Sequence, residues 1–235
     1  MLKKIYNWSS SWTGTIVIVL TIIFFVAQAF VIPSGSMKNT LLIGDMLFVK
    51  KFSYGVPTPT IPWIEVKVLP DFKGNGHLIE GERPKRGDIV VFRYPHNPDI
   101  HYVKRAVAIS GDTIFLKNKI LYLHPKEGND FVKTEFKDYE TIDLNGKLFV
   151  VSPYEKEHKG IHNDINVTKS YSNPKELFDM QEIVIPEDET FMMGDNRDHS
   201  NDSRFWGSVP YKYIVGKPWF IYFSWDDDYK IRWDR

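Results

Sequence analysis

The sequence lacks cysteine, has no excess of either charge and contains only one long apolar run. The absence of Cys excludes a disulfide framework, a thiol nucleophile and thiolate metal ligands. Thirty basic and thirty acidic side chains balance in 235 residues. Because no basic excess or nucleic-acid motif is present, we expect no nucleic-acid partner. The length allows one or two domains with a sizeable buried core.

The single apolar run lies near the N-terminus. Residues 13–32 contain no charged side chain and are mainly Ile, Val, Leu, Phe and Ala. As a helix they would extend about 30 Å, which matches the hydrocarbon core of a bilayer. Trp8 and Trp12 precede the run, where aromatic side chains favour the membrane interface. The pattern predicts a transmembrane anchor at 13–32 after a short segment at 1–12.

The same run also has the pattern of a cleavable signal peptide. Lys3 and Lys4 precede it, and Ala27-Gln28-Ala29 is an A-x-A sequence of the kind found at cleavage sites. The residues at 30–32 continue the apolar run past that site, which favours a permanent anchor over a cleaved peptide.

The rest of the chain has the pattern of β structure. Short apolar, β-branched and aromatic runs recur, separated by turn signals such as Gly-Asp, with no long amphipathic helix between them. This spacing predicts an antiparallel β domain. The segment 117–181 is more polar and is expected to form a smaller inserted β cap. The predicted strands are Met46–Lys51, Asp88–Tyr94, Tyr102–Ile109, Thr113–Leu116, Lys119–Leu123, Lys147–Val151, Glu182–Ile185, Thr190–Met193 and Ile214–Phe223.

A candidate nucleophile, Ser36, precedes the first predicted strand, and a candidate base, Lys104, lies on the third. Ser36 follows the apolar run within Pro33–Met37, and Lys104 lies on a predicted strand next to apolar residues. A serine hydroxyl is a poor nucleophile until a base removes its proton. A lysine amine is that base only when neutral, which requires burial to lower its pKa from about 10.4. A third polar segment, Gly194–Arg204, follows later.

These three segments, in this order, resemble the bacterial type I signal peptidases. The resemblance extends roughly from the apolar run to Thr113 and from Ile183 to the C-terminus. It implies a membrane-anchored serine endopeptidase with Ser36 as nucleophile and Lys104 as general base, a Ser-Lys variant of triad logic. Its partners would be membrane lipid and secretory precursor proteins, whose signal peptides it removes after A-x-A sites. No metal or organic cofactor is implied.

The resemblance also implies roles for residues around this pair. Ser34 would join the backbone N–H of Ser36 in an oxyanion hole, and Ser200 would orient Lys104 by a hydrogen bond. The charged residues that would support the site are Asp195, Arg105, Asp202 and Arg204.

The implied architecture is mostly β: one N-terminal transmembrane helix, then an antiparallel β-sheet catalytic domain with a smaller inserted β cap. The catalytic domain would comprise 33–116 and 182–235, with the cap at 117–181. The implied location is the bacterial plasma (inner) membrane, crossed once, with a cytoplasmic N-terminus and an extracytoplasmic catalytic domain.

Substrate binding is expected where the chain leaves the membrane. Ala29–Ser36 and His101–Lys104 would line one cleft, to which an extended substrate adds as a strand. The expected pocket walls are Phe30, Ile32, Met37, Leu41, Tyr102 and Val103.

Two positions depart from the family pattern, and one of them bears on the mechanism. Asn39 stands where many members have Pro, and His199 replaces a common Asn. Together with His101, His199 leaves a Ser36-His-Asp198 hydrolase as an alternative mechanism. A non-catalytic envelope adaptor on the same scaffold and a self-cleaving Ser-Lys protease are the other alternative functions.

Two further segments have competing interpretations. His158, His162 and Asp164 have spacing that suits metal ligands, but they lie in polar sequence without a catalytic Glu, so we expect no metal site. The Pro-rich apolar loop at 57–64 is expected either to pack on the domain edge or to contact the bilayer surface.

Overall fold

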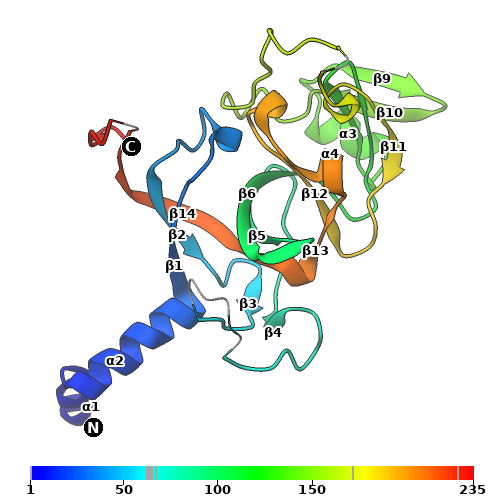
Figure 1. Cartoon of the computed structure of the whole chain (residues 1–235). Coiled ribbons are helices and arrows are strands. Elements are labelled where there is room, and N and C mark those ends of the chain that lie inside the picture. Colours follow the sequence, from blue (N-terminus) through cyan, green and yellow to red (C-terminus); the bar gives the residue numbers. More distant parts are fainter. Residues whose placement is uncertain (1, 62–65, 67, 171, 227) are drawn as a thin grey trace.

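The computed structural model describes residues 2–61, 66, 68–170, 172–226 and 228–235. In this part of the chain the strands form three sheets, and neighbouring strands within each sheet pair in antiparallel fashion (Figure 1). A seven-stranded sheet has the order β1-β2-β14-β5-β6-β12-β13, and a five-stranded sheet the order β11-β7-β8-β10-β9. The strands β3 and β4 pair separately. The predicted class, mostly antiparallel β, is confirmed.

The strands of the large sheet are β1 (Ala27–Val31), β2 (Asp45–Lys50), β5 (Ile89–Tyr94), β6 (Asn97–Ile109), β12 (Glu189–Met193), β13 (Val209–Pro210) and β14 (Ile214–Ser224). Those of the second sheet are β7 (Thr113–Lys117), β8 (Ile120–His124), β9 (Thr141–Leu144), β10 (Lys147–Val151) and β11 (Met180–Val184), and the pair is β3 (Gly55–Pro57) with β4 (His77–Glu80). The helical segments are α1 (Leu2–Ser9), α2 (Trp12–Thr21), η1 (Ile22–Val26), η2 (Gly35–Met37), α3 (Asn129–Glu135), η3 (Lys175–Leu177), η4 (Arg197–His199), α4 (Ser203–Trp206) and η5 (Tyr211–Tyr213).

Every predicted strand is present, with ends displaced by a few residues. The largest displacement is in β6, which begins at Asn97 rather than Tyr102. Besides β1, which was expected to be helical, the strands that the sequence did not predict are short or polar: β3, β4, β9 and β13. Strands of this kind carry little alternation of apolar and polar residues, so local pattern does not distinguish them from loops.

The predicted helix over 13–32 is wrong in its last six residues. After α2, the chain makes one π-helical segment, η1, and becomes the strand β1 at Ala27. This strand pairs with β2, with Ala27 opposite Lys50 and Val31 opposite Met46. The backbone hydrogen bonds to β2 replace those of a helix, because a tertiary partner overrides local propensity.

The helical segments at the N-terminus are bent. No single helix among the described residues is both long and apolar enough to cross a bilayer. The segments Lys3–Ser9 and Trp12–Val26 meet that test together by length and composition, with a bend of 81° between them.

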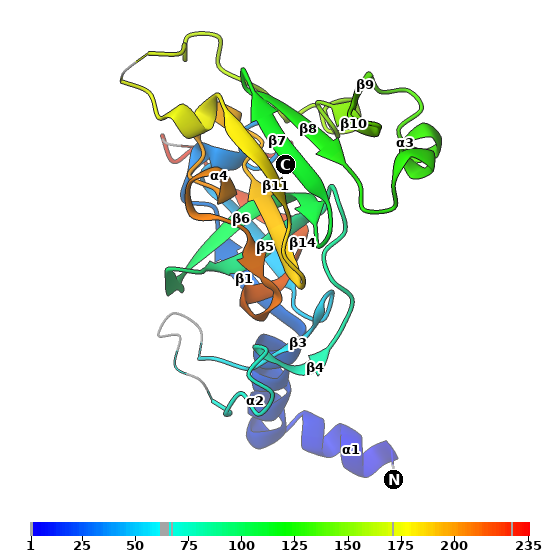
Figure 2. The ribbon, with the colours of Figure 1, turned by 90° about the vertical axis from the view of Figure 1, so that its right-hand side faces the viewer.

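The second sheet begins and ends outside the expected cap. Its strands run from Thr113 to Val184, so residues 113–116, expected in the catalytic domain, belong to this sheet. The reason is that β7 pairs with both β8 and β11. The sheet lies at the opposite end of the molecule from α1 and α2 (Figure 2). Val107 and Ala108 of β6 pack with Ile114 of β7 in one apolar core, so the two sheets share buried surface.

A separate apolar core lies under the turn that contains Ser36. It joins residues from the start of the chain to residues of β2, β5 and β14, which are distant in sequence. Its buried members are Ile32, Met37, Leu41, Leu47, Val49, Val91 and Val215. This packing holds the segment that follows β1 against the large sheet.

The turn before β2 gives a stability prediction. Gly44 has φ +87°, and a Cβ at this position would lie 2.2 Å from the backbone oxygen of Trp225. Gly146 has a similar φ, +82°, but open space around it. Gly146→Ala should cost about 1–2 kcal/mol of unfolding free energy from the left-handed backbone alone. Gly44→Ala should cost roughly 1–3 kcal/mol more because the backbone must move.

Urea unfolding of both variants measures this difference. Equal losses of unfolding free energy in the two variants would show that the contact with Trp225 does not constrain this turn.

Candidate active site

Ser36 lies in η2, a single turn between β1 and β2. Met37 anchors this turn because its side chain is buried in the core beneath. The later polar segment holds the turn from the other side: the Asn196 N–H donates to Ser36 O at 3.0 Å, and Asn196 Nδ2 donates to Gly35 O at 3.0 Å. The position of Ser36 is therefore set by contacts across 160 residues of sequence.

Lys104 lies on β6, in the middle of the large sheet, and its amine reaches the serine. Nζ is 2.6 Å from Ser36 Oγ, and the Lys104 residue is only 4% exposed. Burial lowers the pKa of Lys104 from 10.5 to about 8. The charge of Arg204 lowers this pKa further, whereas the charges of Asp202 and Asp195 raise it. Burial prevails because it removes the water that would stabilise the ammonium.

Two buried ion pairs flank the amine. Arg105 follows Lys104 on β6 and therefore points to the opposite face of the sheet, where it binds both carboxylate oxygens of Asp195 at 2.8 and 2.7 Å. Arg204 binds both oxygens of Asp202 at 2.8 and 2.9 Å. Because each carboxylate already has an arginine partner, neither gives Lys104 the full stabilisation of an unpaired negative charge.

Further hydrogen bonds connect these pairs to the backbone near Ser36. The Thr40 hydroxyl donates to Asp195 Oδ2 at 2.5 Å, and the Gly194 N–H donates to Asp202 Oδ2 at 3.0 Å. The two pairs thus link the loop after the serine to the segment that carries the later polar residues.

Ser34 and Ser200 differ in their contacts with Ser36 and Lys104. The Ser34 hydroxyl oxygen is 3.4 Å from Ser36 Oγ. Ser200 is buried, and its hydroxyl lies near the Asp202 carboxylate, whose pKa it helps to lower, and not within hydrogen-bond distance of Lys104. The structure therefore does not contain the bond from Ser200 to Lys104 that the family resemblance implied.

A cleft of about 410 Å³ opens beside Ser36 and Lys104. Of the predicted pocket walls, Leu41 does not line it and contributes only to the core under the turn. The prediction for Leu41 is thus wrong. The other predicted walls do line the cleft: Phe30, Ile32, Met37, Tyr102 and Val103.

The cleft also has walls that the sequence did not predict. These are Ile100, His199 and Asn201, which lie outside the two segments expected to line the cleft. Their signal was present, since they are neighbours of predicted site residues along the chain.

The residues of the alternative Ser-His-Asp triad are not brought together. His199 Nε2 lies 3.0 Å from Asp164 Oδ2, not beside Asp198. The Asp198 carboxylate pairs with Lys119 Nζ at 2.9 Å and accepts the Asp164 N–H. His101 packs on the ring of Phe30 with centroids 5.1 Å apart, and burial lowers its pKa to about 4.

His162 of the cap pairs through its backbone with the polar segment of the site. The His162 N–H donates to Asp195 O at 2.9 Å, and the Arg197 N–H donates to His162 O at 3.0 Å. Within the described residues, no group of three His, Cys, Asp or Glu side chains has the arrangement to hold a metal ion. His162 therefore connects the cap to the polar segment at 194–204.

Three features were not visible in the sequence. Gly194 is needed for space rather than for its backbone angle, because a Cβ there would lie 2.2 Å from Ser200 Oγ and 2.5 Å from Ser36 O. Arg197 is buried beside Arg204, and burial lowers its pKa to about 10. Asn39 has φ 71°, which proline cannot adopt, so this turn differs from one built on the family's usual Pro.

Residues 5–225 match the model of the family described as "Signal peptidase, peptidase S26". The chain belongs to this family. Signal peptidase I of Helicobacter pylori is 51% identical over 251 residues, covering 95% of this chain and 84% of that protein. Signal peptidase I of Pseudomonas aeruginosa is 37% identical over 232 residues, covering 94% and 73%. These relatives make the chain a hydrolase of the serine endopeptidase class.

A solved structure is also similar to part of this peptidase. The crystal structure of a signal peptidase I from Enterococcus faecalis V583 has 24% sequence identity and a TM-score of 0.36. The match covers 58% of this peptidase and 97% of that chain.

The Arg105–Asp195 pair of this peptidase gives a second prediction. Asp195→Asn keeps the shape of the side chain but leaves the buried Arg105 guanidinium without a charge partner, which should lower the unfolding free energy by about 3 kcal/mol. Asp164→Asn removes a half-exposed carboxylate from its contacts with His199 and Asn166 and should cost much less unfolding free energy, because a surface ion pair contributes little.

Urea unfolding at neutral pH compares the two variants. A loss for Asp195→Asn no greater than that for Asp164→Asn would show that the buried Arg105 guanidinium does not depend on Asp195 as its charge partner.

Proposed function

We propose that this chain is a membrane-anchored endopeptidase that removes signal peptides from exported precursor proteins, with Ser36 as nucleophile and neutral Lys104 as general base. The contact of 2.6 Å between Lys104 Nζ and Ser36 Oγ carries this proposal. Burial supports it, because a pKa of about 8 leaves about a tenth of the amine neutral at pH 7. Family membership supports the reaction class.

The chemistry follows from the positions of these groups. The neutral Lys104 amine accepts the Ser36 hydroxyl proton as Oγ attacks the carbonyl carbon of the scissile bond. The negative oxygen of the tetrahedral intermediate is stabilised by the Ser36 N–H and the Ser34 hydroxyl. The Lys104 ammonium then gives its proton to the leaving amine, which leaves an ester on Ser36. Water, deprotonated by the same amine, hydrolyses that ester and regenerates Ser36.

The charged residues and Ser200 support this chemistry by position. Arg105 with Asp195, and Arg204 with Asp202, hold the segments around the amine while their charges offset each other. Ser200 lies buried near the pair, and a rotation of its hydroxyl side chain toward Lys104 would orient the amine. The mechanism uses only these side chains and needs no metal or organic cofactor.

The cleft suits an extended peptide with small side chains. The backbone that follows β1 and the strand β6 form its two sides, so a substrate strand can add between them. Alternate side chains of that strand would face the apolar wall formed by Phe30, Ile32 and Tyr102. A cleft of this kind fits the A-x-A pattern expected of exported precursors.

Bacterial relatives of this kind are generally membrane-bound, and two features support the same placement here. The side chains of Ile16, Val17 and Leu20 on α2 are exposed to the surroundings of the chain. On β14, Trp219, Phe220 and Tyr222 are also exposed, and this strand is separated by β2 alone from β1, which directly follows the apolar helix. The helix would cross from a cytoplasmic N-terminus and hold the catalytic domain on the other side of the plasma membrane. Confinement to one membrane raises the effective concentration of tethered precursors.

Substitutions of the pair test the mechanism. Ser36→Ala and Lys104→Met should each lower kcat/KM for a precursor with an A-x-A site by roughly 10³-fold or more. Lys104→Arg should be equally inactive, because a guanidinium does not lose its proton in this pH range. Lys85→Met removes a highly exposed lysine and should cleave at the wild-type rate. Turnover by Lys104→Arg would exclude lysine as the base.

The pH profile identifies the base independently. Below the pKa of Lys104, kcat/KM should rise by about tenfold per pH unit, because the neutral amine is the active form. It should level above about pH 8. An imidazole base would give a plateau by about pH 7. His101→Ala should keep the midpoint near pH 8, and a midpoint that moves or vanishes in this variant would assign the base to the histidine.

Membrane retention tests the anchor. The protein should stay with membranes through high-salt and alkaline washing and should keep residues upstream of Ala27. The residues Ala27-Gln28-Ala29 hydrogen-bond to β2, which protects them from the extended binding that a protease requires. N-terminal sequencing of the protein in washed membranes shows whether the residues upstream of Ala27 are kept. A soluble form that begins at Phe30 would instead establish signal-peptide processing.

A further inference from the structure

A small lobe next to the apolar helix exposes an apolar surface. We define the β3–β4 lobe as residues 55–83, of which 62–65 and 67 lie outside the described residues; these include part of the Pro-rich loop at 57–64. Phe72 is 78% exposed. The other exposed large apolar side chains of the lobe are Ile61, Val66, Val68, Leu69 and Ile79. So many apolar side chains on one short segment usually mark an interaction surface.

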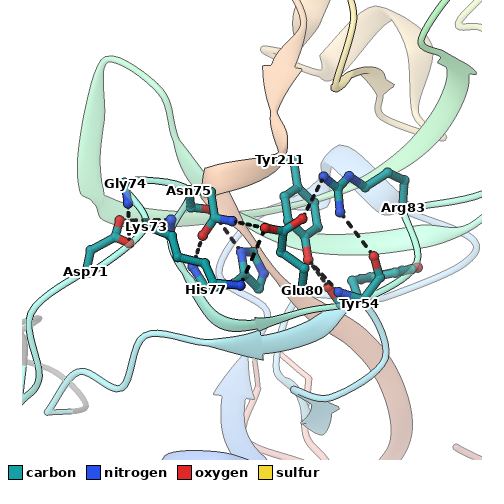
Figure 3. Close-up of polar contacts among 11 residues, drawn as sticks. Tyr54, Asp71, Lys73, Gly74, Asn75, His77, Glu80, Arg83 and Tyr211 are labelled. Carbon is teal, nitrogen blue, oxygen red and sulfur yellow. Dashed lines mark hydrogen bonds and ion pairs between the residues drawn. The ribbon is translucent and has the colours of Figure 1, made fainter.

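A polar stack holds the base of this lobe against the catalytic domain (Figure 3). The ring of Tyr211, from η5, lies between the His77 ring at 4.2 Å and the Arg83 guanidinium at 3.5 Å. The Tyr211 hydroxyl donates to Tyr54 O and accepts the Gly81 N–H. These contacts come from both ends of the lobe, so its orientation relative to the large sheet is fixed.

The tip of the lobe is also ordered by its own contacts. The Asp71 carboxylate accepts the N–H groups of Gly74 and Gly76, each at 2.9 Å (Figure 3). Asn75 Nδ2 donates to Glu80 Oε1 at 2.6 Å. The loop that carries Phe72 is therefore closed at its base by hydrogen bonds.

The lobe lies at the end of the molecule from which the apolar helix leaves (Figures 1 and 2). A groove of about 400 Å³ lies between the lobe and the strands that follow the helix, lined by Gln28 of β1 and Lys51 after β2 on one side and by Thr58 and Asp71 of the lobe on the other. Lys51 Nζ lies 3.1 Å from the carbonyl oxygen of Ile23 in η1, which ties the helix end to this side of the domain.

We propose that the β3–β4 lobe is a second membrane contact, whose apolar side chains lie in the headgroup region of the bilayer that holds α2 and η1. The proposal rests on the membrane anchoring proposed above. Continuity with the helix selects a bilayer as the partner: a lobe fixed beside the point where the helix leaves the domain must meet the surface that the helix enters. Exposed Lys73 and Lys212, on the lobe and beside it, suit the polar edge of such a contact.

A second contact changes what the anchor achieves. A single helix can tilt and rotate within the bilayer, and the catalytic domain joined to it then moves with it. A lobe embedded at a fixed distance from the helix removes this freedom and sets the height and direction of the cleft. The lobe should therefore increase the cleavage rate of precursors that are held in the same membrane and not that of free peptides.

Site-specific labelling tests the contact directly. The chain has no Cys, so Phe72→Cys in the full-length protein gives a single site for an environment-sensitive fluorophore. In proteoliposomes of neutral and anionic phospholipid, the label should be quenched by a doxyl-labelled lipid and protected from iodide. Ile165→Cys is the matched control, because Ile165 is 90% exposed and lies in the cap, and its label should be quenched by iodide alone.

The outcomes separate the two proposals. If the protein floats with the liposomes but the label at position 72 is as open to iodide as that at 165, the second contact is disproved while the anchor stands. If the protein does not float with the liposomes, the anchor is disproved and the second contact with it.

Cleavage assays give an independent measurement. Val68→Asp with Phe72→Asp should lower kcat/KM at least about threefold for a membrane-tethered precursor, because charges are disfavoured in the interface. The rate with a short soluble peptide should stay unchanged, as should both rates for Ile165→Asp. An equal loss for both substrates in the lobe variant would show that the lobe acts through the fold and not through the bilayer.

Discussion

The burial of the Lys104 amine against Ser36 is the constraint on which the rest of the site depends. In water the amine would be an ammonium at neutral pH, unable to accept a proton. Removal of that water lowers the pKa to about 8. This requires a position in the middle of a sheet, and β6 supplies it between β5 and β12. The serine must then reach the amine from outside the sheet, which the turn after β1 accomplishes.

The paired charges explain how a polar segment can surround a neutral lysine. A free carboxylate near Lys104 would stabilise the ammonium and raise its pKa. Asp195 and Asp202 lie close by, but Arg105 and Arg204 each bind one of them through two hydrogen bonds. Buried pairs of this kind add geometric order more than net stability. They fix the backbone that contacts Ser36 while leaving the amine without a carboxylate of its own.

The apolar N-terminal segment serves two parts of the proposed function. Its helical part carries exposed apolar side chains, and its last residues form β1, which pairs with β2 and leads directly into the cleft. The change from helix to strand at Ala27 therefore connects membrane position to substrate position without a flexible linker. The β3–β4 lobe lies beside the same junction, so helix, lobe and cleft are held in one arrangement by the large sheet.

Local sequence determined the strands with clear alternation, the apolar segment and the motifs that contain Ser36 and Lys104, because these signals involve near neighbours in the chain. Only the tertiary structure decided the rest. It ended the helix at Val26, since β2 offers a partner to residues 27–31. It buried Leu41 in the core instead of the cleft, and it made Gly194 a point of close approach to Ser36. These outcomes depend on contacts between residues far apart in sequence, which no local pattern encodes.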